Sequence, residues 1–321
     1  MGAMHLSAFS KIPDVEIAAI CTRDPRALAG DLSHIGGNIQ KHAAVYDFSR
    51  ARKYIEWHEL AGDPELDAVD ICLPTDLHPE VAIAALSANK HVLCEKPMAL
   101  TIPDCHRMIA ASGIHHRILM IGQVLRFWPE YVYLYNFVES QEYGAILSAT
   151  FVRRCGLPDW SRWLPVEERS GGAVLDLLIH DIDQAIHLFG MPERVAAKKL
   201  GDIDALSATL IYPNGPEVRI HGGWFPPGTP LSMSFQVRAR QAELELTPDG
   251  LMLSNQSGRR NRVETAQGDG YDAEIDYFVG CCRIGKEPER CMPQESARAV
   301  QVALLLKQSR AAGGDQLKCL V

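Results

Sequence analysis

Six polar side chains interrupt an otherwise apolar segment, GGAVLDLLIHDIDQAIHLFG, at residues 171–190, and four of them, other than Asp181 and Asp183, recur at helical spacing. They are Asp176, His180, Gln184 and His187, and this spacing puts them on one face of a helix. A polar stripe on a buried helix needs partners, which a ligand cavity supplies. A carboxylate and an imidazole on consecutive turns form a donor and acceptor pair for a sugar diol, and imidazole titrates where a general base works. The segment predicts acid–base chemistry on a hydroxyl group; the alternative is that His180 is a core histidine with internal hydrogen bonds.

A lysine follows a second apolar segment. The stretch HVLCEKP, at residues 91–97, has the pattern of a buried strand that ends in Glu95, Lys96 and Pro97. An ammonium group at the rim of a sheet stabilises negative charge that develops on a reacting oxygen. The alternative is a surface salt bridge, which the apolar residues before Lys96 and the proline after it disfavour.

Three short apolar segments are spaced as the strands of a nucleotide-binding unit. They cover residues 15–21, 68–74 and 91–97, and the segment that begins at Pro79 has apolar residues at helical spacing. This alternation implies a parallel sheet with helices on both faces, in which ligands bind beyond the carboxyl ends of the strands. The residues predicted to line that crevice are Thr22, Arg23, Pro74, Thr75, His78, Glu95, Lys96 and Pro97.

The beginning of the chain matches only the end of a dinucleotide-binding fingerprint. That fingerprint is a strand, then G-x-G-x-x-G, then a helix whose N-terminus holds the pyrophosphate. Gly2 stands at the third glycine and AMHLSAFSKI at the helix, whereas the strand and the first two glycines are absent from the chain. One interpretation is a start at an internal methionine, through truncation or misassignment. The others are that MGAMH is partly a cloning remnant, or that the short form is real and impaired. A chain extended upstream is expected to bind its cofactor more tightly or to fold better.

Four stretches carry a family resemblance: MGAMHLSAF, AVDICLPTDLHPEVAIAAL, HVLCEKPMAL and GGAVLDLLIHDID. Together they resemble the glucose-fructose oxidoreductase / inositol dehydrogenase (Gfo/Idh/MocA) family of nicotinamide-dependent sugar oxidoreductases, over nearly the whole chain. That family opens with a strand and G-x-G-x-M-G-x-x-H, so that Met1 falls where an internal methionine would be. Its E-K-P motif matches residues 95–97, and its D-x-x-x-H motif matches Asp176 and His180.

The resemblance implies reversible oxidation of an alcohol. His180 is then the base that removes the hydroxyl proton, and Asp176 orients the substrate hydroxyls or the imidazole. Lys96 hydrogen-bonds the reacting oxygen and is a candidate to relay the proton. The expected enzyme is an NAD(P)-dependent dehydrogenase or reductase acting on a CH–OH group of a sugar, inositol or related polyol. Which polyol it uses, and in which direction, is not readable from the sequence.

The end of the strand at residues 15–21 decides between NADP and NAD. An acidic residue there binds the ribose 2′-hydroxyl, whereas an arginine accommodates a 2′-phosphate. The family's usual acidic position matches Thr22, and Arg23 follows it, which favours NADP. Asp24 serves NAD if the strand ends one residue later, and the alternative for Arg23 is a solvated turn residue. The predicted cofactor contacts are Met1, Gly2, Thr22, Arg23, Pro74, Thr75, His78, Glu95, Lys96 and Gln123.

Two further stretches supply candidate contacts. GQVLRFWPE, at residues 122–130, follows an apolar run where the family places a residue near the nicotinamide; Gln123 and Arg126 are the candidates, and Arg126 has a structural role as its alternative. The loop before the catalytic segment carries Trp160 and Trp163, which suit sugar faces or serve as packing anchors. The predicted substrate contacts are Lys96, Arg126, Trp160, Trp163, Asp176 and His180.

The predicted fold class is α/β, in two domains. Residues 1–121 form a Rossmann-like, doubly wound parallel sheet, and residues 122–321 form an α+β domain. Beyond the junction, stretches such as ILSATFVRR and EVRIHGGWF alternate apolar and polar residues, which predicts a large open, mainly antiparallel sheet. The catalytic helix and helices near residues 272–283 and 294–311 are expected on one face. The resemblance implies a homodimer or homotetramer through the other, and the polar stretch 254–270 is predicted to be a surface loop.

Composition excludes several classes of protein. The 321-residue chain has a formal net charge of −8 and no long run of Lys or Arg, so nucleic acid is not an expected partner. No apolar run reaches the roughly 18 residues of a membrane span and no signal-peptide pattern is present, which predicts a cytoplasmic protein. The nine cysteines include no C-x-x-C pair, so neither a disulfide framework nor a structural zinc site is expected.

Three rival functions stay open at the level of sequence. A hydrolase or lyase of the same fold would oxidise its sugar transiently, with no net change in nicotinamide absorbance. A metal-dependent enzyme would use Asp176, His180 and Asp183, but no further ligand cluster strengthens it, and no metal is expected. A non-catalytic nucleotide-binding remnant is motivated only by the missing strand, and the presence of Lys96, Asp176 and His180 argues against it.

Overall fold

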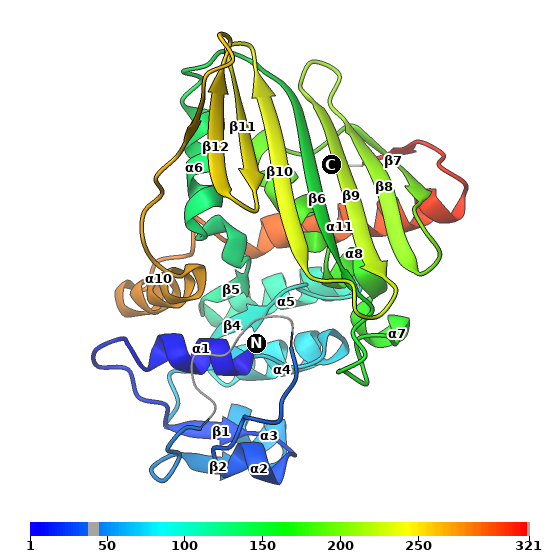
Figure 1. The fold of residues 1–321 in the computed structure, drawn as a ribbon. Coiled ribbons are helices and arrows are strands. Elements are labelled where there is room, and N and C mark those ends of the chain that lie inside the picture. Colours follow the sequence, from blue (N-terminus) through cyan, green and yellow to red (C-terminus); the bar gives the residue numbers. More distant parts are fainter. Residues whose placement is uncertain (38–44, 320–321) are drawn as a thin grey trace. The chain divides into compact units, whose positions relative to one another are not determined.

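The computed structural model describes residues 1–37 and 45–319. The parallel and the antiparallel sheets expected from the sequence are both present, in two compact units (Figure 1). Within the described ranges, no helix is both long enough and apolar enough to cross a membrane.

The first unit comprises residues 1–124 and 269–294. Its strands alternate with helices, as the sequence predicts. The elements are α1 (Gly2–Phe9), β1 (Ala19–Cys21), α2 (Pro25–Leu28), β2 (Arg52–Tyr54), α3 (Trp57–Gly62), β3 (Ala68–Ile71), the 3-10 turn η1 (Thr75–Leu77), α4 (His78–Ser87), β4 (His91–Glu95), α5 (Ile102–His115), β5 (Leu119–Gly122) and α10 (Gly270–Ile284).

Among the described residues, the five strands of this unit pair in parallel. β1 pairs with β2, and β3, β4 and β5 form a second sheet in that order. Residues 92–94 of β4 are fully buried, because helices cover the faces of a parallel sheet. The three predicted strands form, but they are short and end at Cys21, Ile71 and Glu95. Most of the predicted contact residues therefore lie in the turns that follow the carboxyl ends.

The two parallel sheets do not join. Among the described residues β1 pairs only with β2, and β3 pairs only with β4, so each sheet keeps one edge without a strand partner there. The helix expected at AMHLSAFSKI forms as α1, the first element of the unit. It buries Met4, His5 and Ala8.

The late helix α10 corrects one expectation. A helix near residues 272–283 was predicted on the antiparallel sheet, and the helix forms, but it belongs to the first unit and packs against α1. Lys11, just after α1, pairs with Asp272 at 2.6 Å. Apolar periodicity predicts that such a helix exists, but it does not say which surface receives it.

The second unit comprises residues 125–268 and 295–321. It is an open sheet with helices packed on it. The elements are α6 (Pro129–Glu139), β6 (Ile146–Gly156), α7 (Glu167–Ser170), α8 (Gly172–Asp176), α9 (Ile179–Phe189), β7 (Arg194–Lys199), β8 (Asp204–Ile211), β9 (Glu217–Phe225), β10 (Ser232–Ala239), β11 (Ala242–Thr247), β12 (Gly250–Asn255), β13 (Arg260–Arg262), α11 (Pro293–Ala311) and β14 (Leu317–Lys318).

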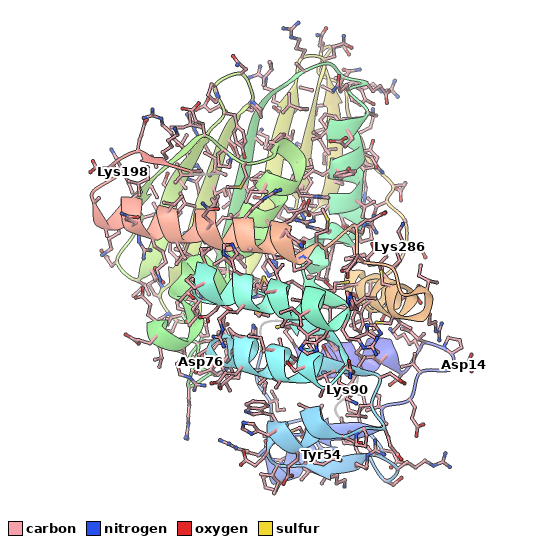
Figure 2. The ribbon with its side chains drawn as sticks, turned by 180° about the vertical axis from the view of Figure 1, so that it is seen from behind. Asp14, Tyr54, Asp76, Lys90, Lys198 and Lys286 are labelled. Atoms are coloured by element: carbon pink, nitrogen blue, oxygen red, sulfur yellow. The ribbon has the colours of Figure 1, made fainter. Side chains whose placement is uncertain are left out.

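The strands of this sheet follow the order β13-β12-β11-β10-β6-β9-β8-β7-β14. Neighbours are antiparallel, except that β6 and β9 run parallel. Helices α8 and α9 contact β6, β8 and β9, and α11 crosses in front of the sheet in Figure 2. There Ser309 accepts a hydrogen bond from the backbone N–H of Ala197 at 2.9 Å. The prediction of a surface loop at residues 254–270 was wrong in part, because residues 260–262 pair with β12 as β13.

Candidate active site

The polar stripe predicted on one helix is divided between two. Helix α8 ends at Asp176, and the backbone N–H groups of Leu177 and Leu178 both donate to the carbonyl of Ala173 at 2.9 Å before α9 begins. The bond from Leu178 reaches back five residues, which is the pattern of a π turn and is frequent at functional sites. The prediction of one continuous helix was therefore wrong, and the four-residue separation of Asp176 and His180 passes through this turn.

The members of the stripe differ in burial. Asp176 and His180 are half-buried, whereas Gln184 is 1% exposed. Neither amide atom of Gln184 has a hydrogen-bond partner among the described residues. The ring of His187 stacks on Tyr135, with centroids 4.6 Å apart. Asp176 and His180 are thus a half-buried carboxylate and imidazole that flank the break between the two helices.

Two glycines and a carboxylate fix the start of α8. Gly171 and Gly172 have φ angles of 78° and 75°, which glycine adopts without strain. A Cβ on Gly172 would lie 2.6 Å from Oδ2 of Asp204, and that oxygen accepts the backbone N–H of Ala173 at 2.6 Å. Asp204 is itself paired with Arg310 of α11 at 2.5 Å. The carboxylate caps α8 only because no side chain stands in its way.

A buried arginine on β6 holds α9. Arg153 donates to the two carboxylate oxygens of Asp181 at 2.8 and 3.0 Å and to the hydroxyl of Tyr131 at 3.2 Å. Asp181 is 0% exposed and Arg153 is 4% exposed. Although burial acts against the charge, Asp181 raises the pKa of the Arg153 guanidinium above its ordinary value. This ion pair fixes the backbone one residue after His180.

Arg126, a predicted substrate contact, holds α9 at a second point. Its Nε and Nη2 donate to the two oxygens of Asp183 at 2.9 and 2.7 Å, and its Nη1 donates to Glu295 of α11. The side chain is 0% exposed. These contacts favour the structural role that the sequence left open for Arg126. They also occupy both oxygens of Asp183, which argues against a metal site made by Asp176, His180 and Asp183.

Arg153 and Asp181 were not predicted as site residues from the sequence. A signal was present in the alternating stretch ILSATFVRR, because Arg153 stands two residues after the buried Phe151 and therefore on the same, inward face of β6. A cation at an inward position requires a buried anionic partner.

In the first unit, Glu95 holds the backbone of Lys96. The N–H of Lys96 donates to Oε2 of Glu95 at 3.0 Å, and Nε2 of His5 lies 3.1 Å from Oε1. Burial acts to raise the pKa of Glu95, but His5 beside it holds that pKa below its ordinary value. Lys96 is half-buried, and its peptide bond to Pro97 is cis. The cofactor contacts predicted at Glu95 and Lys96 stay predictions.

His78 links the turns that follow β3 and β4. Its two ring nitrogens lie 2.9 Å from the carbonyl oxygens of Leu73 and Pro97, and the side chain is 1% exposed. Burial lowers its pKa, so the ring is neutral at pH 7 and donates to one carbonyl at a time. Thr75 is 2% exposed and Pro74 is half-buried. His78 thus positions the two backbone turns that form the edge of the predicted crevice.

The turn after β1 presents a cation. Arg23 is 75% exposed and pairs with Glu56 at 2.8 Å. Asp24 caps α2, where its carboxylate accepts the N–H of Arg26 at 2.9 Å, and its own N–H donates to the hydroxyl of Thr22 at 3.1 Å. The guanidinium is accessible at the carboxyl end of β1, whereas the carboxylate is already used within the turn.

The remaining predicted contacts differ in exposure. Met1 and Trp160 are each 45% exposed, Trp163 is half-buried, and Gln123 is 2% exposed. Gly2 is the first residue of α1. Within the first unit His78 contacts the carbonyl of Pro97 and Glu95 accepts the N–H of Lys96, and within the second Asp176 ends α8 while His180 lies in the first turn of α9.

Comparison with known proteins gives matches over both units. The family model described as an oxidoreductase family with an NAD-binding Rossmann fold matches residues 1–123, and the GFO/IDH/MocA C-terminal domain model matches residues 131–245. The oxidoreductase YrbE of Bacillus subtilis, which has no assigned substrate in its name, is 31% identical over 229 residues, covering 67% of this chain and 62% of that protein.

Two further relatives extend these matches. Inositol 2-dehydrogenase of Salmonella typhimurium is 30% identical over 187 residues, covering 57% of this chain and 50% of that enzyme. The chain therefore spans 62% and 50% of the lengths of these curated relatives. The solved structure of levoglucosan dehydrogenase in complex with NADH and levoglucosan has a TM-score of 0.83 at 20% identity, over 99% of this chain and 96% of that one. That likeness shows a shared fold.

Proposed function

Because the chain belongs to the Gfo/Idh/MocA oxidoreductase family, we propose that it is an NAD(P)-dependent dehydrogenase or reductase acting on a CH–OH group of a sugar, inositol or related polyol. The observation that carries the proposal is Asp176 and His180, which are half-buried on a segment whose other residues are mostly buried. The names of the relatives, inositol 2-dehydrogenase and levoglucosan dehydrogenase, support the same class of substrate.

The residues of the first unit fit a dinucleotide. The strands are parallel within each sheet, so the turns after β3 and β4 lie at one edge, and an exposed guanidinium follows β1. Thr22, Arg23, Thr75 and Lys96 would hold the cofactor, and Gln123 would contact its nicotinamide end. When bound, the nicotinamide supplies the hydride donor or acceptor. The second unit would then bind the substrate.

The protein's own side chains supply the proton chemistry. In the oxidation direction, His180 accepts the proton of the substrate hydroxyl at a ring nitrogen, and in the reduction direction it returns that proton. Asp176 accepts hydrogen bonds from neighbouring hydroxyl groups and so orients the substrate. Lys96 donates a hydrogen bond to the reacting oxygen and stabilises the negative charge that develops there. Trp160 offers an exposed ring to an apolar sugar face.

The proposed preference is for NADP. A 2′-phosphate needs a cation, and Arg23 is accessible, since an exposed ion pair such as the one with Glu56 is weak and exchanges readily. NAD would need a carboxylate at the same place, and Asp24 already caps α2.

The second unit is also proposed to associate with a second copy through the uncovered face of its sheet. On β6, Thr150, Val152 and Arg154 alternate with buried residues. Thr150 and Val152 are half-buried, and Arg154 is exposed. Leu147, near the start of β6, and Leu231, just before β10, are 47% and 39% exposed. Light scattering coupled to gel filtration is expected to give a dimer or tetramer, and a monomer at micromolar concentration contradicts this part of the proposal.

A panel of polyols tests the proposed activity. The protein is mixed with NADP or NAD and with inositols, aldoses or glycosides, and the absorbance of reduced nicotinamide is followed. At least one substrate should give net reduction of the cofactor. His180→Asn and Lys96→Met should each lower kcat by roughly 10²- to 10⁴-fold. His106→Asn, at an exposed histidine of α5, is the matched control and should keep full activity.

Two outcomes contradict the proposal. One is cofactor binding without net turnover of any polyol. The other is near wild-type kcat in both His180→Asn and Lys96→Met.

A further inference from the structure

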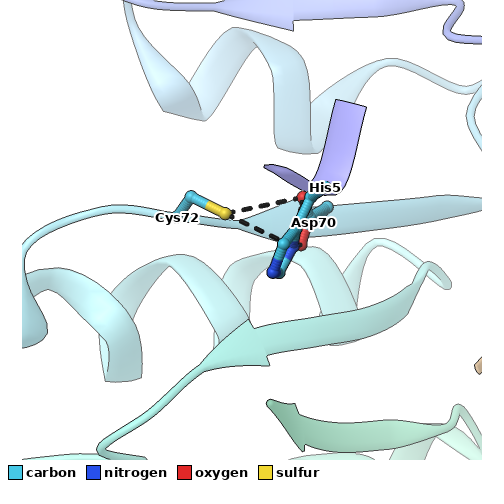
Figure 3. A group of neighbouring side chains, drawn as sticks. All are labelled: His5, Asp70 and Cys72. Atoms are coloured by element: carbon cyan, nitrogen blue, oxygen red, sulfur yellow. Dashed lines mark hydrogen bonds and ion pairs between the residues drawn. The ribbon is translucent and has the colours of Figure 1, made fainter. Parts of the chain in front are cut away.

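Three metal-ligating groups converge in the first unit. His5 comes from α1, Asp70 from β3 and Cys72 from just after β3, as Figure 3 shows. Nδ1 of His5 lies 2.9 and 3.1 Å from the two oxygens of Asp70, and Sγ of Cys72 lies 3.5 Å from Nδ1 and 3.6 Å from Oδ2. We propose that His5, Asp70 and Cys72 bind a zinc ion.

The separations fit a tetrahedral ion. Zinc lies about 2.3 Å from sulfur and about 2.0–2.1 Å from nitrogen or oxygen. At tetrahedral angles this places sulfur about 3.5 Å from the other two ligands, and nitrogen about 3.3 Å from oxygen. The two distances from Sγ, 3.5 and 3.6 Å, match the first figure, and the nitrogen–oxygen distances of 2.9 and 3.1 Å need to widen by only a few tenths of an ångström.

The other ring nitrogen of His5 has the partner that a zinc-bound histidine needs. Nε2 lies 3.1 Å from Oε1 of Glu95, and the His5 side chain is 0% exposed. A carboxylate that accepts this second N–H fixes the tautomer and turns the lone pair of Nδ1 toward the metal. The Asp70 side chain is 23% exposed, so one of the three groups reaches solvent.

A further carboxyl group beside the cluster adds to its suitability for a cation. Glu274 of α10 is 0% exposed, and neither of its oxygens has a hydrogen-bond partner among the described residues.

A proton on His5 is the competing explanation for the same contacts. Burial opposes it, but Asp70 raises the pKa of His5 well above its ordinary value, so an imidazolium between two carboxylates also accounts for the distances. The two explanations differ in the role of Cys72, because a thiol contributes little to an imidazolium pair whereas a thiolate is a strong ligand of zinc.

Metal titration separates them. Tag-free protein, stripped with a chelator, is titrated with Zn²⁺ by calorimetry and with Co²⁺ by absorption spectroscopy. We expect about one equivalent of Zn²⁺ per chain and, with Co²⁺, a thiolate charge-transfer band together with the visible bands of tetrahedral coordination. Neither readout needs the nicotinamide or a substrate, so this proposal fails or stands separately from the proposed function.

Three variants assign the ligands. Cys72→Ser should abolish the charge-transfer band and weaken Zn²⁺ binding by more than about 100-fold, whereas Glu95→Gln should weaken it by roughly 10- to 100-fold and keep the band. Cys282→Ser, at another half-buried thiol of the same unit, should change neither. If Cys72→Ser does not fold, Asp70→Asn and the Co²⁺ spectrum of the unaltered chain still decide. The proposal is overturned if the folded wild-type chain takes up no stoichiometric metal, or if Cys72→Ser binds Zn²⁺ as tightly as wild type.

Discussion

The two units position their candidate reactive groups with different charged side chains: guanidinium groups in the second unit and an imidazole in the first. In the second unit, the helix that carries His180 is held by Arg126 and Arg153, and each guanidinium donates twice to one carboxylate. In the first, the backbone of Lys96 is held through Glu95 by His5. A guanidinium does not lose its charge inside a protein, whereas an imidazole exchanges protons or ligands. The ion pairs of Arg126 and Arg153 therefore form a rigid support for the helix that carries His180. The contact of His5 with Glu95, which supports Lys96, is exchangeable, because His5 can change its proton or its ligand.

The largest effect is expected from breaking the rigid support. Asp181→Asn leaves Arg153 charged, buried and without its anion, which should lower the free energy of unfolding by about 3–5 kcal/mol. Urea denaturation followed by tryptophan fluorescence measures it. Asp202→Asn, in an exposed turn, is the control and should leave the midpoint unchanged. A loss below about 1 kcal/mol would mean that Arg153 finds another partner.

A smaller effect is expected when Arg126 is replaced by lysine, which keeps the positive charge but lacks the planar guanidinium group. Arg126→Lys provides a point charge that cannot span Asp183 and Glu295 together, and it should lower stability by about 1–3 kcal/mol. If Arg126 is structural, KM for the polyol should change by less than about twofold. A large rise in KM at unchanged stability would instead make Arg126 a substrate contact.

The contact of His5 with Glu95, the exchangeable support, should tolerate substitution better than the ion pair of Arg153 with Asp181. In protein stripped of metal, His5→Asn should lower the free energy of unfolding by about 1–2 kcal/mol, since the amide still donates one hydrogen bond and Asp70 is partly exposed. Chemical denaturation beside Asp181→Asn gives the ranking. A loss equal to that of Asp181→Asn would abolish the distinction drawn between the two units.

The smallest effect on stability is expected at the surface of the crevice. Arg23→Ala should leave the unfolding midpoint unchanged, because the side chain is 75% exposed. It should weaken NADPH binding by about 10- to 100-fold and leave NADH binding unaltered, since only the former has a phosphate to contact. Fluorescence titration measures both affinities, with Glu56→Gln as a control that should not weaken NADPH binding. Equal losses for the two cofactors would argue against a 2′-phosphate contact.

Local pattern was a good guide where the burial of a segment is uniform along it. The strand near residues 91–97 could be predicted because its middle is buried on both faces and therefore apolar, and the strand near residues 68–74 because Val69 and Ile71 are buried on either side of Asp70. The same reasoning failed at residues 177–178, since consecutive leucines suit a regular helix as well as the π turn that the structure contains. It also placed α10 in the wrong unit, because its apolar face fits α1 and that pairing joins segments some 260 residues apart, as in the ion pair of Lys11 with Asp272.

The sequence by itself determined the classes of element and the candidate chemical groups: parallel strands with Lys96 after one of them, an alternating sheet, and the Asp176 and His180 pair. These depend on residue type and short-range spacing, which the chain carries locally. Only the tertiary structure decided what each charge is paired with. Arg126 and Arg153 became supports for α9, Glu95 the partner of His5, and Asp70 and Cys72 its neighbours, because a buried charge takes whichever partner the fold brings within hydrogen-bonding distance.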